Sequence, residues 1–225
     1  MMSWNSSKRF LKKMSIRCKL CGLTALDDIS AAVRADASYV GFVFFLGSPR
    51  NLEIRSANLL VAATPNHITK VGLVVDANNN FLDKLTSSIS LDMLQLHGNE
   101  SYQRVAEVKA RYGLSVMKAV GISNLKDVQA AQQYGEVADQ LLLDAKPNSV
   151  SDLPGGNGIA FDWNLLAGSS WKVPWMLAGG LKPNNVATAV KLSGAQQVDV
   201  SSGIETSPGK NNAELMSEFV IQANI

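Results

Sequence analysis

Little in this sequence marks a secreted, membrane-spanning or nucleic-acid-binding protein. Two cysteines in 225 residues are too few for a disulfide framework, and they favour a reducing cytoplasm. No apolar run reaches the roughly 18 residues that span a bilayer. The first fifteen residues lack the apolar centre of a secretory signal. The net charge is only +2 and no basic stripe with interleaved aromatic residues appears, so we expect neither a nucleic-acid nor a membrane partner.

Basic residues gather at the start of the chain, at Lys8, Arg9, Lys12 and Lys13, and without them the remainder is close to neutral. Met14 then precedes the first apolar run. We therefore expect residues 1–13 to be an N-terminal extension, either disordered or the product of a mis-assigned start, with a weak transit peptide as the alternative. The folded domain is expected over residues 14–225.

The rest of the chain alternates short apolar runs with segments of helical spacing. Strands are expected at 17–21, 39–45, 70–75, 93–97, 115–120, 140–144, 175–178 and 197–201. Strands that alternate with helices pair in parallel through right-handed crossovers. Eight such units in this length favour a single (β/α)8 TIM barrel. An open doubly wound sheet would normally carry GxGxxG at its first turn, and the stretch after Cys21 does not match it.

Polar side chains share one face of several expected strands, close to the C-terminal ends. Alternate side chains of a strand point to opposite faces. The residues that share such a face are Lys19 and Cys21, Gln95 and His97, Leu142 and Asp144, and Asp199 and Ser201. In a (β/α)8 barrel this face is the lumen and mouth, where active sites lie. For each residue alone, an ordinary solvent-facing strand end is an equally good interpretation, but several together favour a site.

Cys18 and Cys21 form a CxxC pattern, which elsewhere indicates redox chemistry or zinc. On a strand the two residues lie about 10 Å apart on opposite faces, whereas a disulfide needs Cα atoms within about 7 Å. With only His67 and His97 as further ligands of the usual kind, a metal site is poorly supported. We interpret Cys18 as a small buried hydrophobe. Cys21 lies beside Lys19, whose charge favours the thiolate, so Cys21 is a candidate functional residue.

Glycine-rich turns follow the last two expected strands, at Gly179-Gly180 and at Ser202-Gly203. Backbone N–H groups in such turns bind phosphate oxygens, and barrels often place a phosphate site at these two loops.

Arg50 follows the second strand and can hold a planar carboxylate through two hydrogen bonds, unless it is a solvated surface residue. The long stretch 145–160, rich in proline and glycine, is a candidate mobile lid.

Several motifs together give the chain a family resemblance from about residue 15 to the C-terminus. They are Lys19-Leu20-Cys21-Gly22, Ser48-Pro49-Arg50, Leu94-Gln95-Leu96-His97-Gly98, Leu141-Leu142-Leu143-Asp144, Leu177-Ala178-Gly179-Gly180, Val198-Asp199-Val200-Ser201-Ser202-Gly203-Ile204-Glu205 and Pro208-Gly209-Lys210. In this order they resemble the phosphoribosylanthranilate isomerases, (β/α)8 enzymes of tryptophan biosynthesis.

The resemblance implies an isomerase of the aldose–ketose type. Its reaction is the Amadori rearrangement of N-(5'-phosphoribosyl)anthranilate to 1-(2-carboxyphenylamino)-1-deoxyribulose 5-phosphate, without cofactor or metal. It also implies a cytoplasmic enzyme, a monomer or homodimer, whose partner is this small phosphosugar.

The resemblance also implies roles for individual residues. Cys21 would be the general base and Asp144 the general acid. Arg50 would hold the anthranilate carboxylate, with Asp199 as its neighbour. The phosphate would lie on Gly179, Gly180, Ser202 and Gly203.

Two positions depart from the family pattern. Gly155-Gly156-Asn157-Gly158 replaces the usual Gly-Gly-Thr-Gly or Gly-Gly-Ser-Gly, and Asn211-Asn212 replaces an acidic residue after Lys210. Two alternatives stay open. The histidine-pathway isomerase would have an aspartate where this chain has Cys21, and a catalytically silent barrel would be expected to have lost Cys21 or Asp144.

Overall fold

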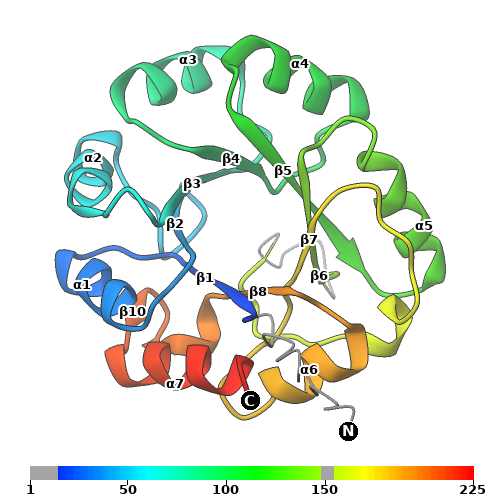
Figure 1. Cartoon of the computed structure of the whole chain (residues 1–225). Coiled ribbons are helices and arrows are strands. Elements are labelled where there is room, and N and C mark those ends of the chain that lie inside the picture. Colours follow the sequence, from blue (N-terminus) through cyan, green and yellow to red (C-terminus); the bar gives the residue numbers. More distant parts are fainter. Residues whose placement is uncertain (1–14, 148–154) are drawn as a thin grey trace, which may run out of the picture.

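Eight parallel strands close into a barrel in the computed structural model, which describes residues 15–147 and 155–225. Each strand pairs with the next one along the chain, and β8 pairs with β1 (Figure 1). The strands are β1 (Arg17–Cys21), β2 (Tyr39–Phe44), β3 (Thr69–Val74), β4 (Met93–Leu96), β5 (Ser115–Ile122), β6 (Gln140–Ala145), β7 (Trp175–Leu177) and β8 (Gln197–Val200). The predicted (β/α)8 barrel is confirmed. The predicted N-terminal extension lies outside the described residues.

Helices surround this barrel as an outer ring (Figure 1). They are α1 (Leu26–Arg34), α2 (Ile54–Ala63), α3 (Asn79–Ser88), α4 (Tyr102–Tyr112), α5 (Leu125–Tyr134), α6 (Val186–Ser193) and α7 (Ala213–Ala223). In the described part of the β6–β7 connection, the 3-10 turn η1 (Trp163–Leu166) stands where an α-helix would complete the pattern. After β8 come the 3-10 turn η2 (Ser202–Ile204) and a small hairpin of β9 (Glu205–Ser207) and β10 (Lys210–Asn211).

The first strand matches its predicted bounds, and the C-terminal ends of the other strands differ from the predicted ones by one or two residues. His97, Ala178 and Ser201 were predicted to end their strands, but each follows directly after the strand. Parallel pairing stops where the chain turns outward toward the next helix, and an alternating pattern of side chains cannot mark that point. The consequence for function is small, because these residues still lie at the mouth of the barrel.

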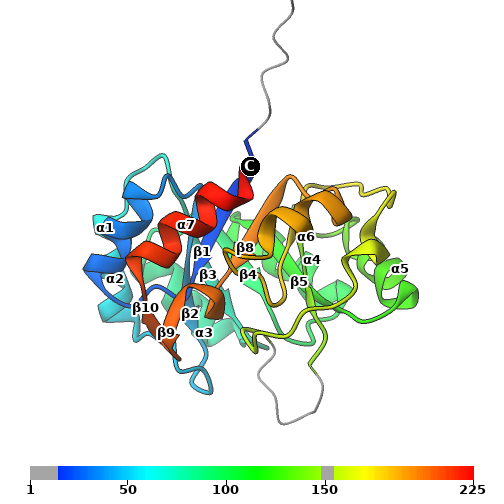
Figure 2. The ribbon, with the colours of Figure 1, turned by 90° about the horizontal axis from the view of Figure 1, so that it is seen from below.

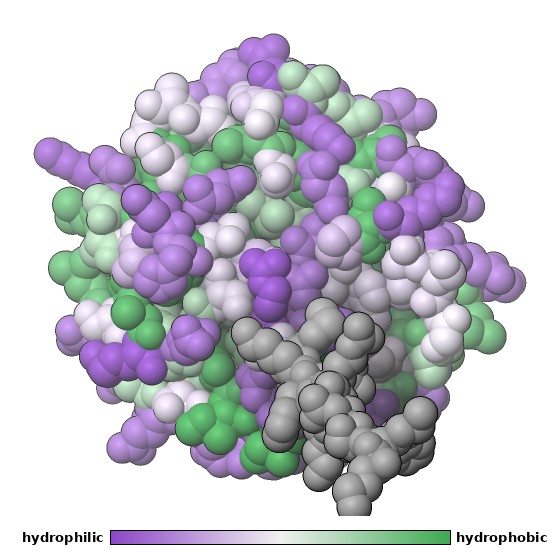
Figure 3. Space-filling model, in the orientation of Figure 1, coloured by the Kyte–Doolittle hydropathy of each residue, from purple (hydrophilic) through white to green (hydrophobic). Residues whose placement is uncertain are grey.

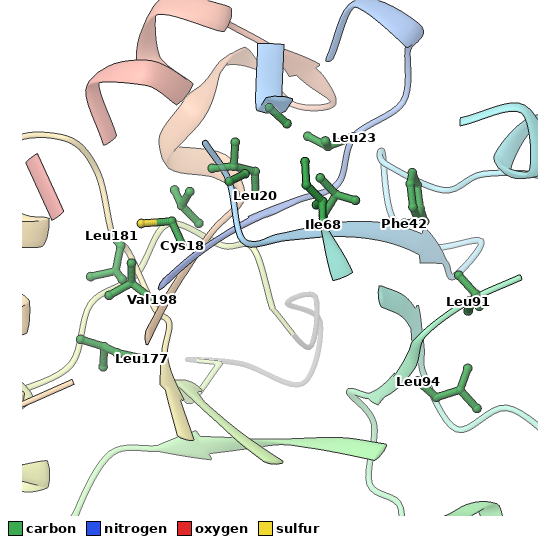
Figure 4. Packing of buried hydrophobic residues seen from close by; sticks show 14 of the residues in the cluster. Cys18, Leu20, Leu23, Phe42, Ile68, Leu91, Leu94, Leu177, Leu181 and Val198 are labelled. Carbon is green, nitrogen blue, oxygen red and sulfur yellow. The ribbon is translucent and has the colours of Figure 1, made fainter. Parts of the chain in front are cut away.

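The strand β1 shows how the barrel divides its side chains between two environments. Cys18 and Leu20 are buried in the large apolar layer between strands and helices, near Val198 and Leu181 in Figure 4. Lys19 and Cys21 have the opposite parity and face the inside of the barrel, as the sequence pattern predicted. A separate apolar cluster also fills the inside of the barrel and reaches the mouth at Ala178; its members are Tyr39, Val71, Met93, Met117, Ala119, Leu142, Met176 and Ala178.

Cys18 gives the protein a testable sensitivity to alkaline pH. Burial, with a smaller contribution from Asp36, raises the pKa of its thiol from 9.0 to about 12. Because the folded pKa lies above the unfolded one, the stability contributed by the protonated thiol is complete below about pH 9. It is lost as the pH rises toward 12.

We therefore expect the free energy of unfolding to fall between pH 9 and 11 by up to about 1.4 kcal/mol per pH unit more than in Cys18→Ala. Urea unfolding of both proteins at pH 8, 10 and 11 measures this difference. Parallel pH dependences would contradict it.

The C-terminus lies on the side of the barrel where the strands begin, and the β9–β10 hairpin lies on the opposite side (Figure 2). The Asn224 side chain anchors this end by accepting a hydrogen bond from the backbone N–H of Ile16 at 2.8 Å. Figure 3 shows the side of the molecule on which the C-terminus lies. In the coloured part of that surface, hydrophilic and hydrophobic residues are intermingled. Among the described residues, no helix is long and apolar enough to span a membrane.

Candidate active site

Two adjoining pockets open at the mouth of the barrel, where the strands end. The first is lined largely by glycine and serine residues that follow β6, β7 and β8, and the second by Cys21, Arg50, His97 and apolar side chains from β2 and β3. Both pockets share a boundary formed by Asp144, Gly155, Gly156, Asp199 and Ser201. A ligand with one polar and one apolar end can therefore extend across both.

Inside the mouth, a buried ion pair lies beside Cys21. Lys19 Nζ is 2.9 Å from Asp199 Oδ1, and neither side chain is more than 9% exposed. Burial lowers the pKa of Lys19, but Asp199 and Cys21 outweigh it and the net pKa is raised, so Lys19 is an ammonium ion. Burial also raises the pKa of Asp199, against the opposing charge of Lys19.

The protonation of Cys21 differs from the simple expectation that a neighbouring cation favours the thiolate. Burial of this thiol is nearly complete and raises its pKa, while the charges of Lys19 and Arg50 oppose the rise. Desolvation is the larger effect because the thiol lies on the inner wall of the barrel, packed against Val43 and Leu73. Cys21 is therefore a thiol at neutral pH in the absence of a ligand, with the thiolate as a minor form.

Asp144 projects from the end of β6 into the boundary between the two pockets. Its Oδ1 accepts a hydrogen bond from the backbone N–H of Ala145 at 2.8 Å. Its Oδ2 lies 3.4 Å from His97 Nε2, and His97 Nδ1 lies 2.9 Å from Gln95 Nε2. Sequence parity placed His97 on the same side as these groups without assigning it a role. The structure adds the contact with Asp144.

Arg50 does not enter the pocket as an isolated cation. Its Nε and Nη2 donate to the two carboxylate oxygens of Glu205 at 2.6 and 2.8 Å, and both side chains are 5% exposed or less. A Cβ atom on Gly156 would lie 2.8 Å from Arg50 Nη1, and one on Gly22 would lie 2.5 Å from Arg50 Cδ. The arginine thus occupies a slot that only glycine neighbours leave open. Glu205 belongs to a matching motif, but no sequence pattern indicated this pairing.

The glycine turns after β7 form a wall of the polar pocket. Gly179 and Gly180 have φ angles of +88° and +62°, in the region that favours glycine. A Cβ on Gly180 would lie 2.7 Å from the backbone nitrogen of Ala160, so the β6–β7 connection packs directly on this turn. Ser202 lines the same pocket.

The remaining residues and segments singled out in the sequence do not all line the polar pocket. Gly203 does not line the polar pocket: a Cβ there would lie 2.0 Å from the Leu181 carbonyl oxygen, so its role toward phosphate stays a prediction. The candidate lid is described only in part, since residues 148–154 lie outside the described residues. Of its described residues, 145–147 and 155–160, Ala145 and the segment from Gly155 to Ile159 line the polar pocket. Asn212, in the second position that departs from the family pattern, caps α7 by accepting from Leu215 N at 2.9 Å.

The closed barrel with its polar pockets at the mouth defines the class of protein: a (β/α)8 barrel enzyme with its site at the C-terminal ends of the strands. Comparison with known proteins identifies the family. The model of the N-(5'-phosphoribosyl)anthranilate isomerase family matches residues 18–222, and the chain belongs to this family. It is an isomerase of tryptophan biosynthesis that converts N-(5'-phosphoribosyl)anthranilate to 1-(2-carboxyphenylamino)-1-deoxyribulose 5-phosphate.

Named relatives agree over nearly the whole domain. The N-(5'-phosphoribosyl)anthranilate isomerase of Cereibacter sphaeroides is 51% identical over 205 residues, which are 91% of this chain and 97% of that protein. Among solved structures, monomers of the dimeric isomerase from Thermotoga maritima give a TM-score of 0.80 at 33% identity, covering 92% and 98% of the two chains. An isomerase in complex with reduced 1-(o-carboxyphenylamino)-1-deoxyribulose 5-phosphate gives 0.80 at 32% identity, with the same coverage.

Proposed function

We propose that this chain performs its isomerisation with Asp144 as the general acid and Cys21 as the general base. The observation that carries the proposal is that both side chains line one pocket, which joins the glycine-lined pocket through Asp144 and Asp199. The substrate has matching halves, an aromatic carboxylate and a phosphorylated sugar. The anthranilate ring would lie against Val43, Leu73 and neighbouring apolar groups, and the phosphate in the polar pocket.

The rearrangement needs two proton transfers that these residues can supply and then reverse. Asp144 gives its proton to the ring oxygen as the furanose C1'–O4' bond breaks, which leaves an iminium ion. The Cys21 thiolate then removes the C2' proton and gives the enolamine. The thiol returns a proton to C1', and the C2' hydroxyl proton returns to Asp144 as the ketone forms. Every proton is accounted for, and both residues recover their starting states.

The assignment of phosphate to the polar pocket predicts a strong effect of added negative charge there. Ser202→Asp should raise the KM for substrate about tenfold or more, because a carboxylate repels the phosphate dianion in a half-buried pocket. Ser207→Asp, on the exposed hairpin strand β9, is the matched control and should leave KM unchanged. Steady-state kinetics of both variants test this, and an unchanged KM in Ser202→Asp would place the phosphate elsewhere.

Arg50 predicts a second binding effect at the opposite end of the substrate. Lysine in its place keeps the charge but loses the fork that pairs with Glu205 while offering Nη1 to a ligand. Arg50→Lys should therefore raise KM about tenfold with a smaller change in kcat, and Arg55→Lys on the exposed face of α2 should change neither. If both substitutions proved equally silent, Arg50 would have no part in carboxylate recognition.

The direct test of the proposed function is conversion of freshly prepared N-(5'-phosphoribosyl)anthranilate, followed by loss of its fluorescence. The purified chain should turn over the substrate without added metal or cofactor, before and after treatment with chelator. Active enzyme would be found in the cytoplasm, where both cysteines stay reduced, as a monomer or homodimer. Sedimentation distinguishes the monomer from the homodimer. No conversion by folded protein would reject the proposal.

A further inference from the structure

A chain of three polar side chains extends from Asp144 into the interior of the barrel. His97 Nε2 lies 3.4 Å from Asp144 Oδ2, and each of these two side chains is only about a tenth exposed. On the other side of the imidazole, Nδ1 lies 2.9 Å from Gln95 Nε2, and Gln95 is completely buried. Each ring nitrogen of His97 therefore faces a polar side chain of the protein.

The surroundings hold this imidazole in place. The backbone N–H of His97 donates to the Val74 carbonyl at 2.9 Å. Lys118, itself 2% exposed, donates to the Gly98 carbonyl at 2.7 Å and pairs with Glu100 at 2.9 Å. A Cβ at Gly155 would lie 2.7 Å from His97 Nε2, so that segment packs directly over the ring. An imidazole fixed in this way has little freedom except in the position of its protons.

The hydrogen-bond geometry links the orientation of the Gln95 amide to the protonation of Asp144. A neutral His97 that accepts at Nδ1 from the amide N–H of Gln95 carries its hydrogen on Nε2, which lies 3.4 Å from Asp144 Oδ2. When the pair holds one more proton, Nδ1 carries hydrogen and needs an acceptor, which the Gln95 amide supplies through Oε1 after turning over. In the described structure Gln95 Oε1 is buried without a hydrogen-bond partner. The amide is thus oriented for the first state, and its oxygen gains a partner in the second.

We propose that His97 shares the catalytic proton of Asp144, and that Gln95 turns its amide as this proton leaves and returns. His97 is a positioning residue that acts through Asp144, so the inference rests on the proposed role of Asp144 as the acid. The physical advantage is clear from reference values: an isolated aspartic acid loses its proton near pH 4, whereas an imidazole keeps one to about pH 6.5. A carboxyl–imidazole pair that titrates as a unit therefore supplies an acid nearer to neutral pH.

Other charged groups face this pair from neighbouring elements. Asp199 on β8 interacts electrostatically with both members and is itself paired with Lys19 on β1. Arg50 and Cys21 line the same pocket, while Lys118 and Glu100 pair with each other and contact the backbone of Gly98, next to His97. A substitution of His97 leaves all of these charges in place. The change in pH dependence can then be assigned to the imidazole.

The experiment measures kcat/KM against pH for the wild type and for His97→Gln, in which an amide keeps a polar contact but binds no proton. Activity requires the acid form of the pair and the thiolate. At low pH the acid form is complete in both proteins, so the two curves should approach each other. At pH 8 we expect a loss of about 10–100-fold, which shrinks by tenfold or more at pH 5. KM should change less than threefold. His67→Gln, at the exposed second histidine, is the control and should match the wild type at every pH.

Substitutions of Gln95 test the amide turn in opposite directions. Glu accepts only and favours the extra proton, so Gln95→Glu should improve relative activity at high pH. Gln95→Met removes the acceptor, so it should show the same pH-dependent loss of kcat/KM as His97→Gln, but a smaller one. This second variant keeps the test decisive if the buried glutamate of Gln95→Glu prevents folding. A His97→Gln loss that is equal at all pH values would overturn the inference.

The Asp144→Asn variant separates this inference from the proposed function. If that variant kept its activity, Asp144 would not be the general acid, and the role given to Asp144 under the proposed function would be rejected. An inactive Asp144→Asn together with a pH-independent His97→Gln loss would reject the shared proton alone. NMR gives a readout that does not depend on turnover. In His67→Gln the one remaining imidazole of the chain is that of His97, so its signals can be followed alone. Its titration should move to lower pH when Asp144→Asn is added, and an unmoved titration would count against the pairing.

Discussion

Replacing Asp144 with asparagine should lower kcat by about 10²–10⁴-fold while leaving KM within a few-fold of the wild type. The amide keeps the size of the side chain and can retain the contact with the Ala145 N–H, made at 2.8 Å by the carboxylate. It has no proton to give to the ring oxygen, so the furanose would open without acid catalysis. The loss therefore falls on the chemical step rather than on binding, which pre-steady-state and steady-state kinetics can distinguish.

The matched control is Asp139→Asn, directly before the same strand and so at its opposite end. Asp139 Oδ2 accepts from the Val116 N–H at 2.9 Å, and its other oxygen pairs with Lys109 at 2.7 Å. This substitution should reduce stability slightly and leave kcat unchanged. Near wild-type turnover in Asp144→Asn would exclude Asp144 as the acid and place that group on another strand.

The barrel could be predicted from the sequence because the relevant signal is local and repeated. Each strand is a short apolar run followed by a turn, and the parity of β1 correctly placed Lys19 and Cys21 inside the barrel and Cys18 outside it. The ends of the strands were less accurate, since His97 and Ser201 follow β4 and β8 instead of ending them. The alternation of apolar and polar residues within one strand does not show at which residue that strand stops pairing with the adjacent strand.

Contacts between distant parts of the chain were beyond the same patterns. The pair Arg50–Glu205 joins residues 155 positions apart, and His97–Asp144 joins the ends of β4 and β6. Neither partner signals the other in sequence. The balance at Cys21 also needed the structure, because Lys19 predicted a favoured thiolate while the burial that outweighs it arises only from packing in the folded barrel.

Replacing Cys21 with serine should produce a loss as large as that in Asp144→Asn, about 10²–10⁴-fold in kcat/KM or beyond. A serine hydroxyl in the same buried position is a far weaker acid than a thiol, so almost no base form exists to remove the C2' proton. Cys18→Ser is the matched control: it makes the same chemical change three residues away, on the opposite face of β1. It should lower stability and leave kcat/KM unchanged. If both serine variants were fully active, the base would have to be another group.

The pH dependence of the wild type separates the two residues further. Burial raises the pKa of Cys21 above its ordinary value of 9.0, against the opposing charges of Lys19 and Arg50. The active form then combines an acid still protonated with a thiol already ionised, which is a minor species at every pH. Because a carboxyl acid ordinarily loses its proton at a much lower pH than a thiol, the alkaline limb of kcat/KM belongs to Cys21 and should lie above pH 9. Lys19→Met removes the nearest cation and should raise the pKa of Cys21 further, so the alkaline limb moves upward while the plateau falls by the same factor. A limb that moved downward would show that Lys19 acts on Cys21 in some way other than through its charge.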